Sequence, residues 1–261
     1  MFKKTLLLLG VMALATPAMA TELTNPFYTP NKGHVASVTS LEASRYQDKD
    51  KSGYNGRQYD KVLSEALSYG VTDEISVDAA ISNTWMRQAP KMGISEVNKE
   101  DTNIDWVLGG TYTYGTGPVK MQGKLAYGQK ESWSHENGGA YKYVRADAKA
   151  GYDFGVVLPY VQASWEMPLW ASHDGADKPI YLVRGAAYKQ WCDKLATDLG
   201  IAYTHFEGSE ISTWTVDAEV SYFLTPDWTL GMYGNYAFDG RSKDRGTVYA
   251  EKIGLRLRTQ F

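Results

Sequence analysis

Apolar and polar residues alternate with a period of two along most of the chain after residue 33. Near the C-terminus, Ile253, Leu255 and Leu257 occupy every second position, and Arg256 and Arg258 occupy positions of the other set. Successive side chains of a β-strand point to opposite faces, so this pattern predicts strands with one apolar and one polar face. Apolar residues spaced for an α-helix are almost absent. The chain is therefore expected to be an all-β protein.

Twelve segments carry this alternation. In two of them the outer face is not decided by the pattern: Leu63 and Leu67 share a face with Glu65, and in 179–190 neither face is clearly apolar. The predicted strands are 34–47, 58–71, 74–87, 102–115, 118–131, 140–154, 157–168, 179–190, 194–206, 211–224, 228–239 and 247–261.

The links between the predicted strands alternate between short and long. The links 72–73 and 116–117 are short, whereas 48–57 and 88–101 are long and polar. The link 207–210 is an exception, because it is short in a place where a long link is expected. Such alternation predicts an antiparallel meander whose turns lie at two different ends. We expect one domain over 34–261.

Charged residues at the strand centres indicate which face points outward. Burying many charges in a core would cost several kcal/mol each before pairing, and soluble barrels such as lipocalins have eight strands. If the apolar face contacts lipid, the charges lie in the lumen instead. Segments of about 10 to 14 residues also suit tilted strands that cross a membrane. The predicted fold is a transmembrane, antiparallel, up-and-down β-barrel of about 12 strands.

Composition agrees with this fold and excludes other classes. The sequence has 19 tyrosines and 8 tryptophans, and several of them fall near predicted strand ends, as rings at a membrane–water interface do. Lys and Arg number 27 and Asp and Glu number 30, so the chain lacks the basic excess of nucleic-acid-binding proteins. The single cysteine, Cys192, excludes a disulfide framework and a cysteine-based metal site.

The first twenty residues have the features of a secretory signal peptide. Lys3 and Lys4 precede the apolar stretch 5–16, and residues 18–20 (Ala-Met-Ala) match a small-x-small cleavage site. Residues 1–20 are therefore predicted to be removed. No run of 18 apolar residues follows, so no transmembrane helix is expected.

The segment 21–33 contains Pro26 and Pro30 and shows no alternation. We predict that it is a periplasmic N-terminal segment. Two arrangements are open: a tail tucked at the rim of the barrel, which we favour, and a small plug that enters the lumen.

The signal peptide, the amphipathic strands, the turn sequence 68–73 (SYGVTD) and the final Phe261 resemble Gram-negative outer-membrane β-barrel proteins, including small porin-like channels. The resemblance implies the cell outer membrane as location and its lipid as the surroundings. It also implies recognition by the barrel assembly machinery through the C-terminal strand that ends in Phe261. One departure is Thr259, where that signal usually has an apolar residue five positions after a glycine. No motif selects one family.

The residues predicted to face the lumen carry both signs of charge in equal number. A ring of one sign would select ions by charge, whereas a balanced set predicts weak selection or ion pairs that fill the lumen. We favour an open narrow pore over a filled lumen, and both remain open. The basic residues are Lys120, Lys124, Arg145, Lys149, Arg184, Lys252, Arg256 and Arg258, and the acidic residues are Glu42, Asp78, Asp105, Asp147, Glu166, Asp198, Asp217 and Glu219.

The first and last strands must pair to close the barrel. Glu42 on the first strand is placed to face Lys252, Arg256 and Arg258 on the last. Two interpretations remain open for this set: a wall that attracts anions, and ion pairs that close the seam.

The function that these features favour is passive diffusion of small hydrophilic solutes. The alternative is a closed structural or surface-interaction barrel that acts through its outer loops. His135 and His173 each lie beside a carboxylate in predicted loops, but adjacency in sequence does not supply catalytic geometry. We therefore expect no enzyme, no cofactor and no metal site.

Overall fold

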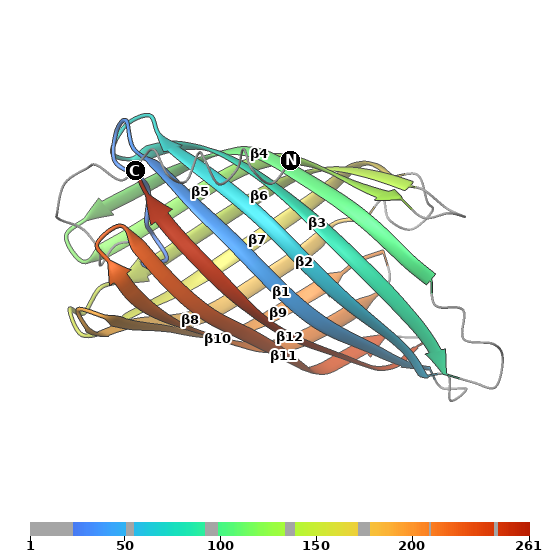
Figure 1. Ribbon diagram of the computed structural model, residues 1–261. Coiled ribbons are helices and arrows are strands. Elements are labelled where there is room, and N and C mark those ends of the chain that lie inside the picture. The colour runs from blue at the N-terminus through green and yellow to red at the C-terminus, as the bar shows by residue number, and fades with distance from the viewer. Residues whose placement is uncertain are drawn as a thin grey trace.

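The computed structural model describes residues 23–50, 55–91, 99–133, 139–171, 178–208, 210–242 and 245–261, and these form a closed antiparallel barrel (Figure 1). The predicted signal peptide, His135 and His173 lie outside the described residues. The strands are β1 (Val35–Asp50), β2 (Asn55–Gly70), β3 (Ile75–Lys91), β4 (Lys99–Thr116), β5 (Val119–Trp133), β6 (Gly139–Tyr152), β7 (Leu158–Ala171), β8 (Ile180–Cys192), β9 (Leu195–Phe206), β10 (Ile211–Thr225), β11 (Trp228–Ser242) and β12 (Arg245–Gln260).

Each strand pairs with its neighbours in sequence, and β1 closes the barrel on β12. The seam is in register from Ala36 opposite Gln260 to Asp48 opposite Val248. Val35 and Phe261 exchange both backbone hydrogen bonds at its end, at 2.8 and 3.1 Å. The prediction of a twelve-stranded antiparallel barrel is confirmed. The strands before and after the long links extend further than predicted, as in β4, because hairpin pairing continues beyond the apolar alternation.

The short turns are stabilised by local side chains. Between β2 and β3, the Thr72 hydroxyl accepts hydrogen bonds from the backbone N–H groups of Glu74 and Ile75, at 3.2 and 3.0 Å. Hydroxyl residues stabilise turns in this way. The chain therefore reverses tightly at this end, where the C-terminus also lies (Figure 1).

The apolar face of the strands points outward. Leu125 and Ile253 are 66% and 60% exposed, and the inner positions between such residues are partly buried. Leu63 and Leu67 are exposed too, so the undecided face of β2 is the outer one, and Glu65 lies on it. Among the described residues, no helix is long and apolar enough to cross a membrane.

The one cluster of buried apolar residues lies where the N-terminal segment meets the wall, within the described part of the chain. It holds Phe27 from that segment and residues of β7 to β10, namely Leu158, Tyr160, Tyr188, Ala196 and Phe223. The other inner positions of the barrel are mostly polar, so little apolar surface is buried inside it apart from this cluster.

Candidate functional site

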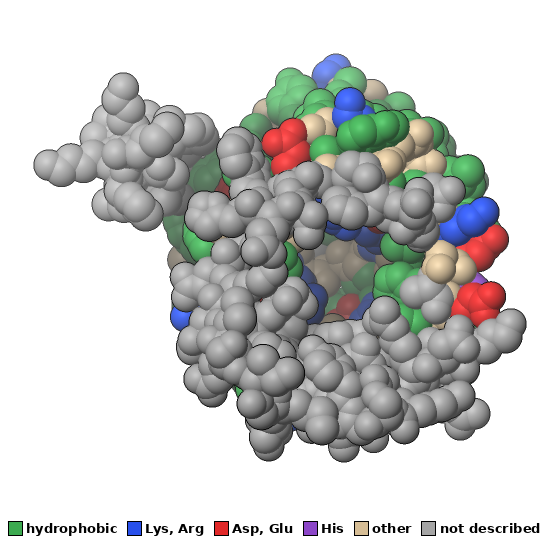
Figure 2. Space-filling view, turned by 90° about the vertical axis from the view of Figure 1, so that its right-hand side faces the viewer, with side chains coloured by type: hydrophobic (Ala, Val, Ile, Leu, Met, Phe, Trp, Pro, Cys, Tyr) green, Lys and Arg blue, Asp and Glu red, His purple; other side chains and the backbone are tan. Residues whose placement is uncertain are grey.

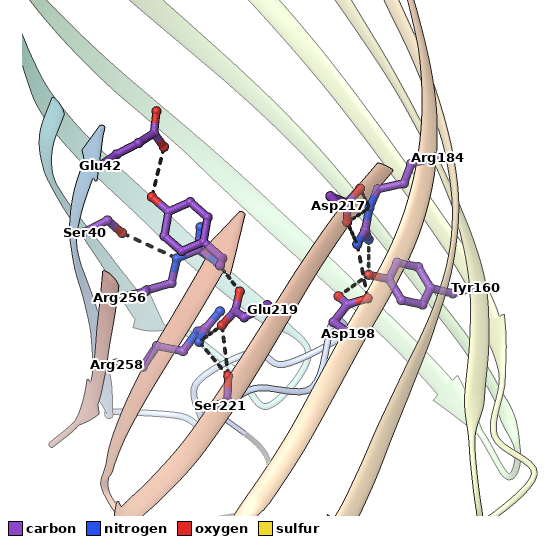
Figure 3. Close-up of polar contacts among 11 residues, drawn as sticks. Ser40, Glu42, Tyr160, Arg184, Asp198, Asp217, Glu219, Ser221, Arg256 and Arg258 are labelled. Atoms are coloured by element: carbon purple, nitrogen blue, oxygen red, sulfur yellow. Dashed lines mark hydrogen bonds and ion pairs between the residues drawn. The ribbon is translucent and has the colours of Figure 1, made fainter. Parts of the chain in front are cut away.

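The inner wall carries the charged residues predicted for the lumen. Figure 2 looks into the barrel from the end with the long links, and the hollow at its centre shows basic and acidic side chains. Two groups on neighbouring strands contain most of the ion pairs of one wall (Figure 3). The seam cluster comprises Glu42, Glu219, Tyr233, Lys252, Arg256 and Arg258. The β8–β10 cluster comprises Arg184 on β8, Asp198 on β9 and Asp217 on β10, together with Tyr160, which reaches them from β7.

Glu219 on β10 is the centre of the seam cluster. Arg256 donates from Nη1 to Glu219 Oε2 at 2.6 Å, and Arg258 donates to Oε1. Ser221 Oγ also donates to Oε1, at 3.0 Å. The Glu219 side chain is only 14% exposed, so two guanidinium groups neutralise a carboxylate with little access to water.

Glu42 on β1 is the second carboxylate of this cluster. Lys252 Nζ lies 2.8 Å from Glu42 Oε1, and the Tyr233 hydroxyl donates to Oε2 at 2.9 Å. The Arg256 guanidinium stacks over the Tyr233 ring, 4.2 Å from its centroid. Of the three cations predicted to face Glu42, Lys252 pairs with it, whereas Arg256 and Arg258 reach across β11 to Glu219.

Arg184 on β8 organises the β8–β10 cluster. Its Nε donates to both oxygens of Asp217, at 2.9 and 3.1 Å, and its Nη2 donates to Asp198 at 3.1 Å. Its Nη1 donates to the Tyr160 hydroxyl, which in turn donates to Asp198 at 2.6 Å. One guanidinium group therefore forms ion pairs with two carboxylates.

Glycines let these side chains lie flat on the wall. Arg184 crosses β9 at Gly200, where a Cβ atom would lie 2.6 Å from the Arg184 Nε. Tyr233 crosses β12 at Gly254, where a Cβ atom would lie 2.5 Å from the ring. In both places a long side chain bridges two strands that are not direct neighbours, because the strand between them has no side chain there.

The remaining predicted lumen residues lie mainly on β3 to β7. Lys124 pairs with Asp78 at 3.1 Å, and Arg145 pairs with Asp147 at 2.9 Å. Other carboxylates accept from tyrosines: Asp105 from Tyr143 at 3.2 Å and Glu166 from Tyr141 at 3.0 Å. Lys120 is on the inner face of β5, between exposed Val119 and Met121.

The N-terminal segment, residues 23–33, lies inside the end of the barrel that has the short turns (Figure 1). Leu23 and Phe27 are each 5% exposed. The Phe27 ring packs edge-on against Tyr160 of β7 at 5.8 Å. Lys149 donates to the Pro26 carbonyl oxygen at 3.0 Å. These contacts are those of a plug inside the lumen. They are not those of a tail at the rim, the arrangement that we favoured from the sequence.

Further contacts fix the segment on several sides. The Tyr28 hydroxyl donates to Gln260 on β12 at 2.5 Å, and the Thr24 hydroxyl lies 2.8 Å from the Tyr188 hydroxyl on β8. Thr29 contacts Thr113 on β4 at 2.5 Å. The segment therefore bridges the lumen from wall to wall.

Among the described residues, two cavities with charged side chains in their walls lie in the lumen. The larger, of 460 Å³, is bordered by the seam cluster, by the β8–β10 cluster and by residues 23–26. The smaller, of 340 Å³, is bordered by Lys124, Tyr143, Arg145 and Asp147. Lys149 and Gln162 line both cavities. The lumen is thus narrowed but not filled.

No protein-family model and no curated protein matches the sequence. An outer-membrane channel from Pseudomonas putida F1 is similar in structure, with a TM-score of 0.66 at 11% identity, covering 95% of this chain and all of that chain. The translocator domain of the autotransporter NalP from Neisseria meningitidis gives 0.57 at 10% identity, covering 87% and 88%. The transport unit of the autotransporter AIDA-I from Escherichia coli gives 0.56 at 11% identity, covering 100% and 97%.

This is the fold of an outer-membrane β-barrel. The resemblance inferred from the sequence is confirmed at this level, and no single family is assigned. Channels and autotransporter domains share the fold, so the function of this outer-membrane-type barrel must be argued from its lumen.

Several residues that shape the lumen were not predicted. Tyr143, Tyr160 and Tyr233 hold lumen carboxylates, although tyrosines were considered only for the rims. Their inward parity within the strands could have indicated this role. In the described part of the chain, no group of three or more His, Cys, Asp or Glu residues is placed to hold a metal ion.

Proposed function

We propose that this protein is an outer-membrane channel through which small hydrophilic solutes diffuse passively. The observation that carries the proposal is the 460 Å³ cavity, whose wall is charged while the outside of the barrel is apolar. Charged side chains that keep contact with water, such as Lys252 at 35% exposure, give a polar solute partners in place of the water it loses.

The path we assign to the solute follows the inner wall from the long links toward the short turns. No covalent step is involved, and width and charge decide what passes. The lining residues assigned to it are Lys120, Lys124, Arg145, Asp147, Lys149, Glu166, Arg184, Asp198, Asp217, Glu219, Lys252, Arg256 and Arg258.

The proposal includes a membrane orientation. Barrels of the bacterial outer membrane have short periplasmic turns and longer extracellular loops. The short turns, the N-terminal segment and Phe261 would then face the periplasm. Export by the signal peptide 1–20 and insertion through the C-terminal strand fit this arrangement.

A second candidate is a closed barrel that acts through its surface. The observation that favours it is the N-terminal segment, which bridges the lumen between β4, β8 and β12. Ion pairs on the wall add to the obstruction. This candidate requires that no solute passes.

Swelling of protein-containing liposomes distinguishes the two candidates. We expect swelling in glycerol, slower swelling in arabinose and glucose, and little in sucrose, because the lumen is narrowed. Liposomes carrying heat-denatured protein are the control. Absence of swelling in glycerol, with a correctly folded barrel in the same vesicles, would favour the closed barrel.

A further inference from the structure

Ion pairing leaves the two clusters of the larger cavity with opposite net charge. In the seam cluster, three cations face two carboxylates, and all four carboxylate oxygens already have partners. One positive charge is therefore in excess. Arg256 and Lys252, at 28% and 35% side-chain exposure, are the cations that a solute can reach most easily.

The β8–β10 cluster has the opposite excess. Arg184 is its one cation, and each of its three guanidinium nitrogens donates to a partner within the cluster. Asp198 and Asp217 together carry two negative charges, so one negative charge is in excess. Their side chains are 22% and 25% exposed.

The two clusters border the same 460 Å³ cavity and meet on β10 (Figure 3). Asp217 and Glu219 are two residues apart on the inner face of this strand. With a rise of about 3.3 Å per residue, their Cα atoms are about 7 Å apart along the strand. A small molecule can therefore contact both clusters at once.

We propose that this cavity takes solutes that carry both an ammonium and a carboxylate group, as free α-amino acids do; this inference rests on the proposed channel function. The ammonium group is placed at Asp198 and Asp217, and the carboxylate at Arg256 and Lys252. A guanidinium or ammonium group recognises a carboxylate by charge-assisted hydrogen bonds.

A solute that carries only a positive or only a negative charge cannot pair with both clusters. An anion attracted by Arg256 meets Asp217 nearby, and a cation attracted by Asp217 meets Arg256. The remaining charge on the lining is Lys149, whose Nζ donates to the Pro26 carbonyl oxygen of the N-terminal segment. Lys149 would favour anions slightly over cations.

Uptake of radiolabelled solutes of similar size into liposomes containing the full-length protein tests the proposal. The set is serine as the zwitterion, glycerate as the anion, ethanolamine as the cation and glycerol as the neutral solute. We expect serine to enter several-fold faster than glycerate or ethanolamine, with a rate that saturates at high serine concentration.

Two variants should shift the preference in opposite directions, one toward the anion and the other toward the cation. The double variant Asp198→Asn/Asp217→Asn removes both negative charges and leaves the positive charge of Arg184 without a carboxylate, so glycerate should overtake serine. Arg256→Gln removes the positive excess, so ethanolamine should gain on serine. Lys130→Gln is the matched control: Lys130 pairs with Asp105 at 3.9 Å and does not border this cavity, so the order of the four solutes should not change.

Different results would contradict the zwitterion site and the channel function. Equal entry of all four solutes, or faster entry of glycerate into wild-type vesicles, overturns the zwitterion site and leaves the channel standing. No entry of any solute overturns the channel itself, and the inference falls with it. The variants are compared only after heat-dependent mobility in SDS gels shows a folded barrel.

Discussion

Glu65 is a carboxylate on the outer, apolar face of the barrel. It lies between exposed Leu63 and Leu67, and its oxygens accept hydrogen bonds from the Ser37 and Thr39 hydroxyls of β1. No ion pair to Glu65 is present within the described part of the chain. In a bilayer such a charge is unfavourable, because an ionised side chain on the lipid face of a barrel loses hydration. The two hydroxyls explain how the position is tolerated.

The substitution Glu65→Gln should therefore stabilise the barrel in lipid. The amide can keep hydrogen bonds with Ser37 and Thr39 while the charge is removed, and we expect a gain of about 1 kcal/mol in the free energy of unfolding. Urea unfolding in lipid vesicles measures it. Glu251→Gln is the control, because it loses an exposed pair with Arg45 and should cost about 1 kcal/mol or less. A lower stability for Glu65→Gln would show that the carboxylate itself is required.

At the scale of the strands, the bridges over glycine join elements that do not pair directly. Tyr233 on β11 crosses Gly254 on β12 to reach Glu42 on β1, and Arg184 on β8 crosses Gly200 on β9 to reach Asp217 on β10. These side-chain contacts stabilise the barrel wall in addition to the backbone hydrogen bonds between neighbouring strands. They also hold the carboxylates that border the larger cavity.

Gly254→Ala should weaken this stabilisation. The new methyl group would lie 2.5 Å from the Tyr233 ring, so the ring must move and its hydrogen bond to Glu42 must lengthen. Overpacking of this kind costs about 1–3 kcal/mol. Gly123→Ala on β5 is the control, because no atom lies within 4 Å of the added methyl group. The temperature at which the folded band is lost in SDS gels measures the effect. Equal temperatures for the two variants would contradict the stabilising role of this contact.

The strands could be predicted from the sequence because their alternation is a local property. The face of β2 could not, since Glu65 shares it with leucines and only pairing with β1 shows how the charge is accommodated. The N-terminal segment has no periodicity, and its position depends on partners as distant as Tyr188 and Gln260. Likewise, Arg258 pairs with Glu219 and not with Glu42, and this pairing depends on the register of three strands.

At the scale of the whole molecule, the lumen charges are balanced, and this limits the field that an ion meets. We expect a reversal potential near zero in a salt gradient. Replacing Arg145, Arg256 and Arg258 with glutamine should shift the selectivity toward cations, because Asp147 and Glu219 then lose their cationic partners. Planar-bilayer recordings measure the shift. A shift toward anions, or none in a variant that folds, would contradict the assignment of these residues to the path.

The N-terminal segment lies across the path that the solute would take, so removing it should change the conductance of the channel. The decisive measurement is the single-channel conductance of the full-length protein in planar lipid bilayers, compared with a variant that lacks residues 23–31. Phe27→Ala, which keeps the chain length and removes the packing on Tyr160, serves as an intermediate case. We expect small conductance steps for the wild type, larger or more frequent steps for Phe27→Ala, and the largest steps for the deletion. If neither the wild type nor the deletion conducts, although both form folded barrels in the same bilayers, the lumen is not a path for solutes.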